Sequence, residues 1–116
     1  MLIVYGLKNC DTCRKARAWL DGKGAEYRFV DLRADGFAET DMERWAEVAG
    51  WENLLNRRGT TWRGLGEAEK AVAGASDAIA LMAKHPALMK RPIFDDGTMV
   101  VVGFTPDCQK RVEAML

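Results

Sequence analysis

The sequence contains only one histidine, three cysteines and three prolines in 116 residues. A structural zinc site normally takes four cysteine or histidine ligands at paired spacings, and beyond Cys10 and Cys13 the chain offers only Cys108 and His85. We therefore expect no metal ion. An odd number of cysteines is also unlike a disulfide scaffold and favours a reducing compartment, in which any disulfide would be transient.

Net charge and long apolar runs are absent as well. The 17 acidic and 17 basic residues cancel, so no overall field draws the protein to nucleic acid or to a membrane surface. No window approaches the roughly 18 apolar residues of a spanning helix. The first residues, MLIVYGLKNC, lack the basic start and the apolar length of a secretory signal. We expect a cytoplasmic monomer that binds neither nucleic acid directly nor membranes.

The first third of the chain predicts a βαβ unit. Residues 2 to 5, LIVY, are typical of a buried strand, and residues 12 to 20 carry apolar side chains at helical spacing until Gly22. A second strand is predicted over 25 to 32, where Tyr27 and Phe29 alternate with Arg28 and Val30. Such a unit has parallel strands joined by a right-handed crossover.

A helical insertion at about residues 39 to 88 is predicted to follow. It lacks strand-like alternation and contains several helical runs, one of them with Ser76 as its expected N-cap. Two short strands, PIF and MVVVGF, come next, and the Asp-Gly between them favours a hairpin. Thr105 is expected to cap a final helix that begins at Pro106. This order predicts an α/β, thioredoxin-like fold in a single domain over 1 to 116.

Cys10 and Cys13 stand where a loop meets the first predicted helix. A helix N-terminus has N–H groups without partners and about half a positive charge, so it can hold a thiolate and lower the thiol pKa from about 8.5. Lys8 and Arg14 add positive charge nearby. Because residues three apart are neighbours on a helix, Cys13 could attack a mixed disulfide formed on Cys10. We predict that Cys10 is the nucleophile and Cys13 the resolving thiol; packing of Cys13 as a small core residue is the alternative.

Arg91 differs from the other arginines because it directly precedes a proline that begins a strand. In a thioredoxin-like fold a cis proline at this point, here Pro92, lies against the reactive cysteine. The residue before it would face the thiolate, where a guanidinium could stabilise the sulfur and hold an oxyanion or a carboxylate. Cys108 is expected to pack in the core, and His85 to interact with a helix end.

Three motifs in order carry a resemblance to a known family. They are KNCDTCRKARAWL near the start, LLNRRGTTWR in the middle, and HPALMKRPI followed by VGF near the end. Together they cover essentially the whole chain and resemble the arsenate reductase (ArsC) and Spx family. Within that family the chain is most similar to short arsenate-reductase-like proteins described as glutathione-dependent thiol reductases.

The resemblance implies an oxidoreductase without a tightly bound cofactor. Glutathione would be a co-substrate, with a glutaredoxin- or thioredoxin-type reductant, and Cys10 would attack a small oxyanion or a disulfide. Three arginines bind the oxyanion in the arsenate reductases. Arg91 matches one, the second falls near Asn56, and Phe104 stands in the region of the third. Each lost charge-assisted bond costs about 1.5 to 3 kcal/mol, which favours a thiol or disulfide substrate over arsenate.

The residues expected to bind substrate or glutathione are Arg58, Arg57, Asn9, Pro92 and Arg14. The resemblance also leaves a second function open. In Spx-type regulators the C-x-x-C pair is a disulfide switch, and the protein binds the C-terminal domain of the RNA polymerase α subunit. This chain has the two switch cysteines, Cys10 and Cys13, while its middle motif is more similar to the reductases. We expect an enzyme and keep the redox-sensing regulator as the alternative.

Overall fold

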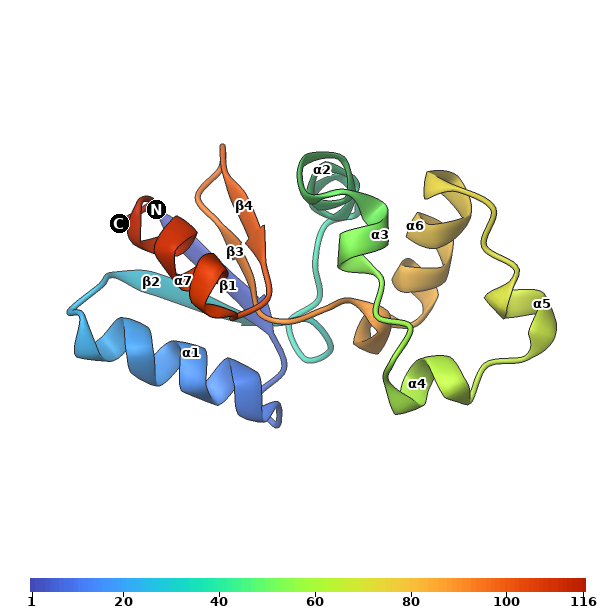
Figure 1. The fold of residues 1–116 in the computed structure, drawn as a ribbon, viewed down its shortest axis with the longest axis horizontal. Helices are drawn as coiled ribbons and strands as arrows, with labels where there is room; N and C mark the ends of the chain where they lie inside the picture. Colours follow the sequence, from blue (N-terminus) through green and yellow to red (C-terminus); the bar gives the residue numbers. More distant parts are fainter. The chain divides into compact units, whose positions relative to one another are not determined.

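The computed structural model describes residues 1 to 116, which divide into two compact units. We call residues 1–36 with 91–116 the sheet unit, and residues 37–90 the helical unit. Both units are drawn in Figure 1. None of the helices has the length and apolar character needed to span a bilayer.

The sheet unit holds all four strands. Its elements are β1 (Leu2–Gly6), α1 (Asp11–Gly22), β2 (Tyr27–Asp31), β3 (Ile93–Asp95), β4 (Val100–Val102) and α7 (Pro106–Glu113). The strand order is β2-β1-β3-β4, with β1 parallel to β2 and the other pairs antiparallel. The predicted α/β class and the parallel βαβ unit are confirmed. The predicted second strand is present as β2, and at its end Val30 and Asp31 are both buried.

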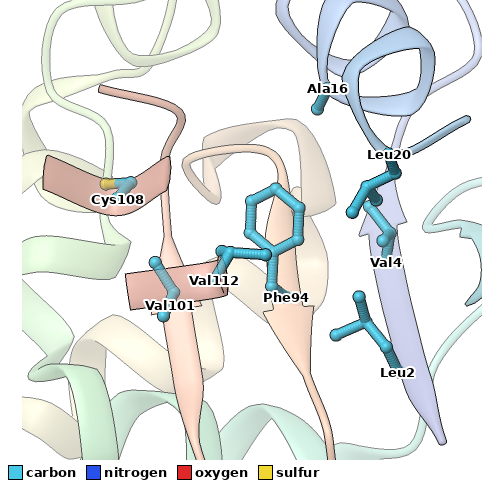
Figure 2. Close-up of a cluster of buried hydrophobic side chains, with 8 residues drawn as sticks. All are labelled: Leu2, Val4, Ala16, Leu20, Phe94, Val101, Cys108 and Val112. Atoms are coloured by element: carbon cyan, nitrogen blue, oxygen red, sulfur yellow. The ribbon is translucent and has the colours of Figure 1, made fainter. Parts of the chain in front are cut away.

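One face of this sheet carries the core of the unit. Val4 pairs with Phe94, and Phe94 pairs with Val101, so these three side chains project to the same face. Helices α1 and α7 cover that face (Figures 1 and 2). The cluster in Figure 2 consists of Leu2, Val4, Ala16, Leu20, Phe94, Val101, Cys108 and Val112. The expectation that Cys108 packs in the core is confirmed.

The hairpin and the last helix follow the predicted turn and cap chemistry. Gly97 adopts a φ of +96°, and Asp96 Oδ1 accepts hydrogen bonds from two backbone N–H groups of the turn. Thr105 is the N-cap of α7 and accepts the N–H of Cys108 at 3.2 Å, with Pro106 at the first helical position. These local signals need no tertiary information, which is why the sequence predicts them well.

The helical unit contains five α-helices and one 3₁₀ helix. They are α2 (Glu39–Ala49), α3 (Trp51–Leu54), α4 (Thr60–Arg63), α5 (Glu67–Lys70), α6 (Ala75–Lys84) and η1 (Pro86–Leu88). Met42, Trp45, Leu54 and Met82 are each 0% exposed and form part of the buried interior. The predicted cap at Ser76 is wrong. The cap residue is Gly74, so helix α6 begins at Ala75, two residues earlier than a cap at Ser76 requires.

The end of the helical unit returns beside α3. Lys90 N–H donates to Leu54 at 2.7 Å, and Asn56 N–H donates to Leu88 at 2.7 Å. At the start of α6, Asp77 accepts the N–H of Ala73 at 3.1 Å. This bond connects the segment before α6 to the first turn of the helix, while Gly74 is the cap residue and no side chain caps the helix.

Candidate active site around Cys10

The loop after β1 presents Cys10 at the start of α1. Cys10 is the N-cap residue, with extended backbone angles (φ −99°, ψ 120°) and no capping bond from its side chain. Its N–H donates to the Leu7 carbonyl at 3.2 Å, and its own carbonyl accepts from Arg14 at 3.0 Å. The sulfur is therefore not used for capping and lies, half-buried, at the positive end of a 12-residue helix.

The surroundings of Cys10 favour its thiolate. Partial burial raises the pKa of the thiol, but the N–H and the thiol of Cys13 donate hydrogen bonds to the sulfur, and Arg91 adds a hydrogen bond and its positive charge. These donors outweigh the burial, so the pKa of Cys10 lies below its ordinary value.

Cys13 has the opposite character. Its side chain is 1% exposed, and burial is the main cause that raises its pKa to about 11; the neighbouring Cys10 raises it further. Cys13 also lies directly against the backbone of β1, because a Cβ added at Gly6 would be 2.5 Å from its sulfur. The two cysteines thus divide into one accessible thiol with a lowered pKa and one buried thiol with a raised pKa.

A cavity of about 530 Å³ opens beside Cys10. It is lined by Leu7, Lys8, Asn9, Cys10, Asp31, Arg33, Ala34 and Arg91. Three of these residues are cationic, and the single carboxylate, Asp31, already accepts backbone N–H groups with both oxygens. The cavity is therefore suited to an anionic group next to the sulfur.

Sequence reasoning missed Arg33 and Asp31 as wall residues. Both come at or just after the end of β2, and β2 runs parallel to β1 with Asp31 opposite Gly6. Because parallel strands end at the same edge of a sheet, residues that follow β2 meet those that follow β1. The predicted βαβ unit therefore already implied that the residues after β2 lie beside the loop that carries Cys10.

The structure brings four of the sequence-predicted residues together: Cys10, Cys13, Asn9 and Arg91. Pro92 is buried and forms a cis peptide bond with Arg91, as predicted. Arg14 is placed differently. It pairs with Asp11 on the exposed first turn of α1 and does not line the cavity.

Arg57 and Arg58 belong to the helical unit and stay predictions as ligands. The Arg57 guanidinium lies 5.8 Å from the ring centre of Trp51 and 5.6 Å from that of Trp62. His85 lies at the end of α6, where its Nε2 is 2.8 Å from Glu69. No group of three or more His, Cys, Asp or Glu side chains in the chain is arranged to hold a metal ion.

A mixed four-stranded sheet, with a cysteine at the start of its first helix and a cis proline before β3, defines a thioredoxin-like protein. The chain belongs to the ArsC family, which matches residues 5–112. The resemblance seen in the three sequence motifs is thereby confirmed.

Solved structures and curated relatives agree with this assignment. A structure of a protein named YFFB is 42% identical, covers 96% of this chain and 97% of that chain, and superposes with a TM-score of 0.89. An arsenate reductase (ArsC) related protein from Brucella melitensis is 38% identical, with coverage of 99% and 95% and a TM-score of 0.75. The global transcriptional regulator Spx of Streptococcus pyogenes is 27% identical over 92% of this chain and 81% of its own length.

Proposed function

We propose that this protein is a thiol–disulfide oxidoreductase whose nucleophile is the Cys10 thiolate. One observation carries the proposal: Cys10 is accessible at a helix N-terminus and hydrogen-bonded by Cys13 and Arg91, while Cys13 is buried and protonated beside it. Membership of a family with arsenate-reductase-related members supports the same class of chemistry.

The reaction takes two exchange steps. The Cys10 thiolate attacks one sulfur of a substrate disulfide, forms a mixed disulfide, and releases the other half as a thiolate that takes a proton from water. Cys13 then loses its proton and attacks the Cys10 sulfur, and the second half leaves and takes up that proton. The substrate gains two electrons, and Cys10 and Cys13 become a disulfide, which a thiol reductant returns to the dithiol.

The charge on Cys10 helps to order these steps. That charge is one of the causes that raise the pKa of Cys13. It disappears when Cys10 enters the mixed disulfide, so Cys13 becomes easier to deprotonate only after the first step. Cys13 is thus kept inactive until there is a mixed disulfide to resolve.

The cavity favours a co-substrate thiol that carries negative charge. Lys8, Arg33 and Arg91 line the space beside Cys10, and carboxylates bind guanidinium groups through paired hydrogen bonds. Glutathione carries two carboxylates and is the co-substrate we propose, alone or through a glutaredoxin- or thioredoxin-type protein. Turnover of arsenate and of a glutathione mixed disulfide, measured separately, tests which substrate the enzyme takes.

Arg91→Gln is expected to raise the pKa of Cys10 by about one unit, because the sulfur loses a charge-assisted hydrogen bond. The rate of alkylation, which follows the thiolate, then shifts to higher pH and falls about tenfold below the pKa. Absorbance of the thiolate against pH gives the value directly. Arg14→Gln is the matched control, since Arg14 pairs with Asp11 outside the cavity. An ordinary pKa for Cys10 in the wild type would contradict the proposed function.

Arg33→Glu is expected to raise the KM for a glutathione mixed disulfide about three- to tenfold, because one attraction is lost and one repulsion is added at an exposed position on the cavity wall. The KM for an uncharged disulfide should stay the same. Arg28→Glu makes the same charge change on β2 away from the cavity and should affect neither substrate. Equal effects of Arg33→Glu on both substrates would argue against anion recognition by Arg33.

A second candidate function rests on the Spx relatives and on the paired cysteines. As a redox-sensing regulator, the protein would bind the RNA polymerase α subunit, and oxidation of Cys10 and Cys13 would change that binding. Purified α subunit, mixed with the reduced and the oxidised protein, should form a complex in one state more than in the other. Absence of a complex in both states would leave the oxidoreductase alone.

A further inference from the structure

A buried carboxylate lies behind the loop that carries Cys10. Asp31 is the last residue of β2, stands opposite Gly6 in the parallel register, and is 6% exposed. Neither step of the proposed reaction uses it. A buried carboxylate is costly unless it is fully hydrogen-bonded, so its partners indicate what it does.

Asp31 joins two segments that are far apart in sequence. One oxygen, Oδ2, accepts the N–H of Lys8 at 3.0 Å. The other, Oδ1, accepts the N–H groups of Arg33 and Ala34, each at 2.9 Å. A carboxylate has the acceptor capacity for all three, whereas an amide in its place offers a single oxygen and would turn its NH₂ group toward one of the donors.

The bond to Lys8 falls at the centre of the loop between β1 and α1. Within that loop, Cys10 N–H reaches back to Leu7, and the bond from Lys8 to Asp31 connects the loop to the neighbouring strand. The position of the Cys10 sulfur relative to Arg91 and to the N–H of Cys13 depends on this loop. A shift of the loop would lengthen the hydrogen bonds that the thiolate receives.

We propose that Asp31 is a positioning residue for Cys10, whose carboxylate holds the Lys8 amide and thereby keeps the Cys10 sulfur in reach of Cys13 and Arg91. This inference rests on the proposed function, since it assigns Asp31 to the activation of the same nucleophile. Because both oxygens of Asp31 already accept backbone N–H groups, its proposed role is in positioning and not in substrate binding or proton transfer.

The sign of one measurement separates positioning from a plain charge effect. Asp31, Lys8, Arg33 and Arg91 are the charged side chains on the cavity wall near Cys10. If Asp31 acted only through its negative charge, its removal would take away a repulsion. The thiolate of Cys10 would then form more easily, and the pKa of Cys10 would fall. If Asp31 positions the loop, its removal weakens the donors to the sulfur and raises that pKa.

The test compares Asp31→Asn with Asp35→Asn. Asp35 lies in the same turn and accepts the N–H of Asp31 at 2.9 Å, so its substitution removes an equal charge without touching the Lys8 bond. We expect Asp31→Asn to raise the pKa of Cys10 by about one unit and to slow alkylation by iodoacetamide about tenfold at pH values below that pKa. Asp35→Asn should leave both unchanged. An unchanged or lowered pKa in Asp31→Asn overturns the inference.

A measurement on the unaltered protein keeps the inference testable if Asp31→Asn does not fold. The amide resonance of Lys8 should follow the protonation of Asp31 as the pH is lowered, and a Lys8 amide that does not respond overturns the inference. The two proposals also fail differently. An ordinary pKa for Cys10 in the wild type would contradict the proposed function. A lowered pKa of Cys10 that stays the same in Asp31→Asn would contradict only the positioning role.

Discussion

Cys10→Ser is expected to abolish disulfide reduction, whereas Cys13→Ser is expected to stop the reaction after its first step. A serine hydroxyl stays protonated at neutral pH and cannot replace the thiolate that Cys13 and Arg91 stabilise at Cys10. In Cys13→Ser the nucleophile remains, but no resolving sulfur is present. Without an added thiol, the Cys10 mixed disulfide should therefore accumulate.

Mass spectrometry of the intact protein checks both outcomes. After exposure to a glutathione disulfide, Cys13→Ser should carry one glutathione per chain on Cys10, and Cys10→Ser should carry none. Cys108→Ala is the matched control, because this third cysteine is buried in the core between the sheet and α7. An adduct on Cys13, or turnover by Cys10→Ser, would contradict the assigned roles.

The parts of the fold that the sequence predicts are those that depend on local signals. The run at residues 2 to 5, the Asp-Gly turn and the cap at Thr105 each specify their structure within a few neighbours. The local signal failed at Ser76, which is an acceptable cap type but lies inside the helix. The cap residue is Gly74, and Asp77 in the first turn accepts the N–H of Ala73.

The candidate site is only partly readable from the sequence, because its electrostatics depend on contacts between distant segments. The placement of Cys10 at a helix start is local and was predicted. That Asp31 and Arg33 reach the same cavity requires the register between β1 and β2. Arg14, which is close in sequence, points to Asp11 instead, since residues three apart on a helix are near neighbours. Reasoning from nearness in sequence therefore placed Arg14 in the site and missed Asp31 and Arg33.

Gly6→Ala is expected to destabilise the protein by about 1 to 3 kcal/mol, the usual cost of overpacking a filled interior. The reason is space and not backbone conformation. A Cβ at residue 6 would lie 2.5 Å from the Cys13 sulfur and 3.4 Å from both Cys13 Cβ and Phe29 Cε1. The sulfur would have to move, and because Cys13 donates hydrogen bonds to Cys10, the pKa of Cys10 should rise as well.

A double-mutant cycle identifies the clash. Cys13→Ala removes the sulfur but leaves the Cβ contact at 3.4 Å, so Gly6→Ala should cost much less in that background, with a coupling of about 1 to 2 kcal/mol in urea unfolding. Gly22→Ala is the control: nothing lies within 4 Å of its added Cβ, and it should give the same change in free energy of unfolding in both backgrounds. An equal cost of Gly6→Ala in both backgrounds would show that the Cys13 sulfur is not packed against β1. The protected position of the resolving thiol would then need another explanation.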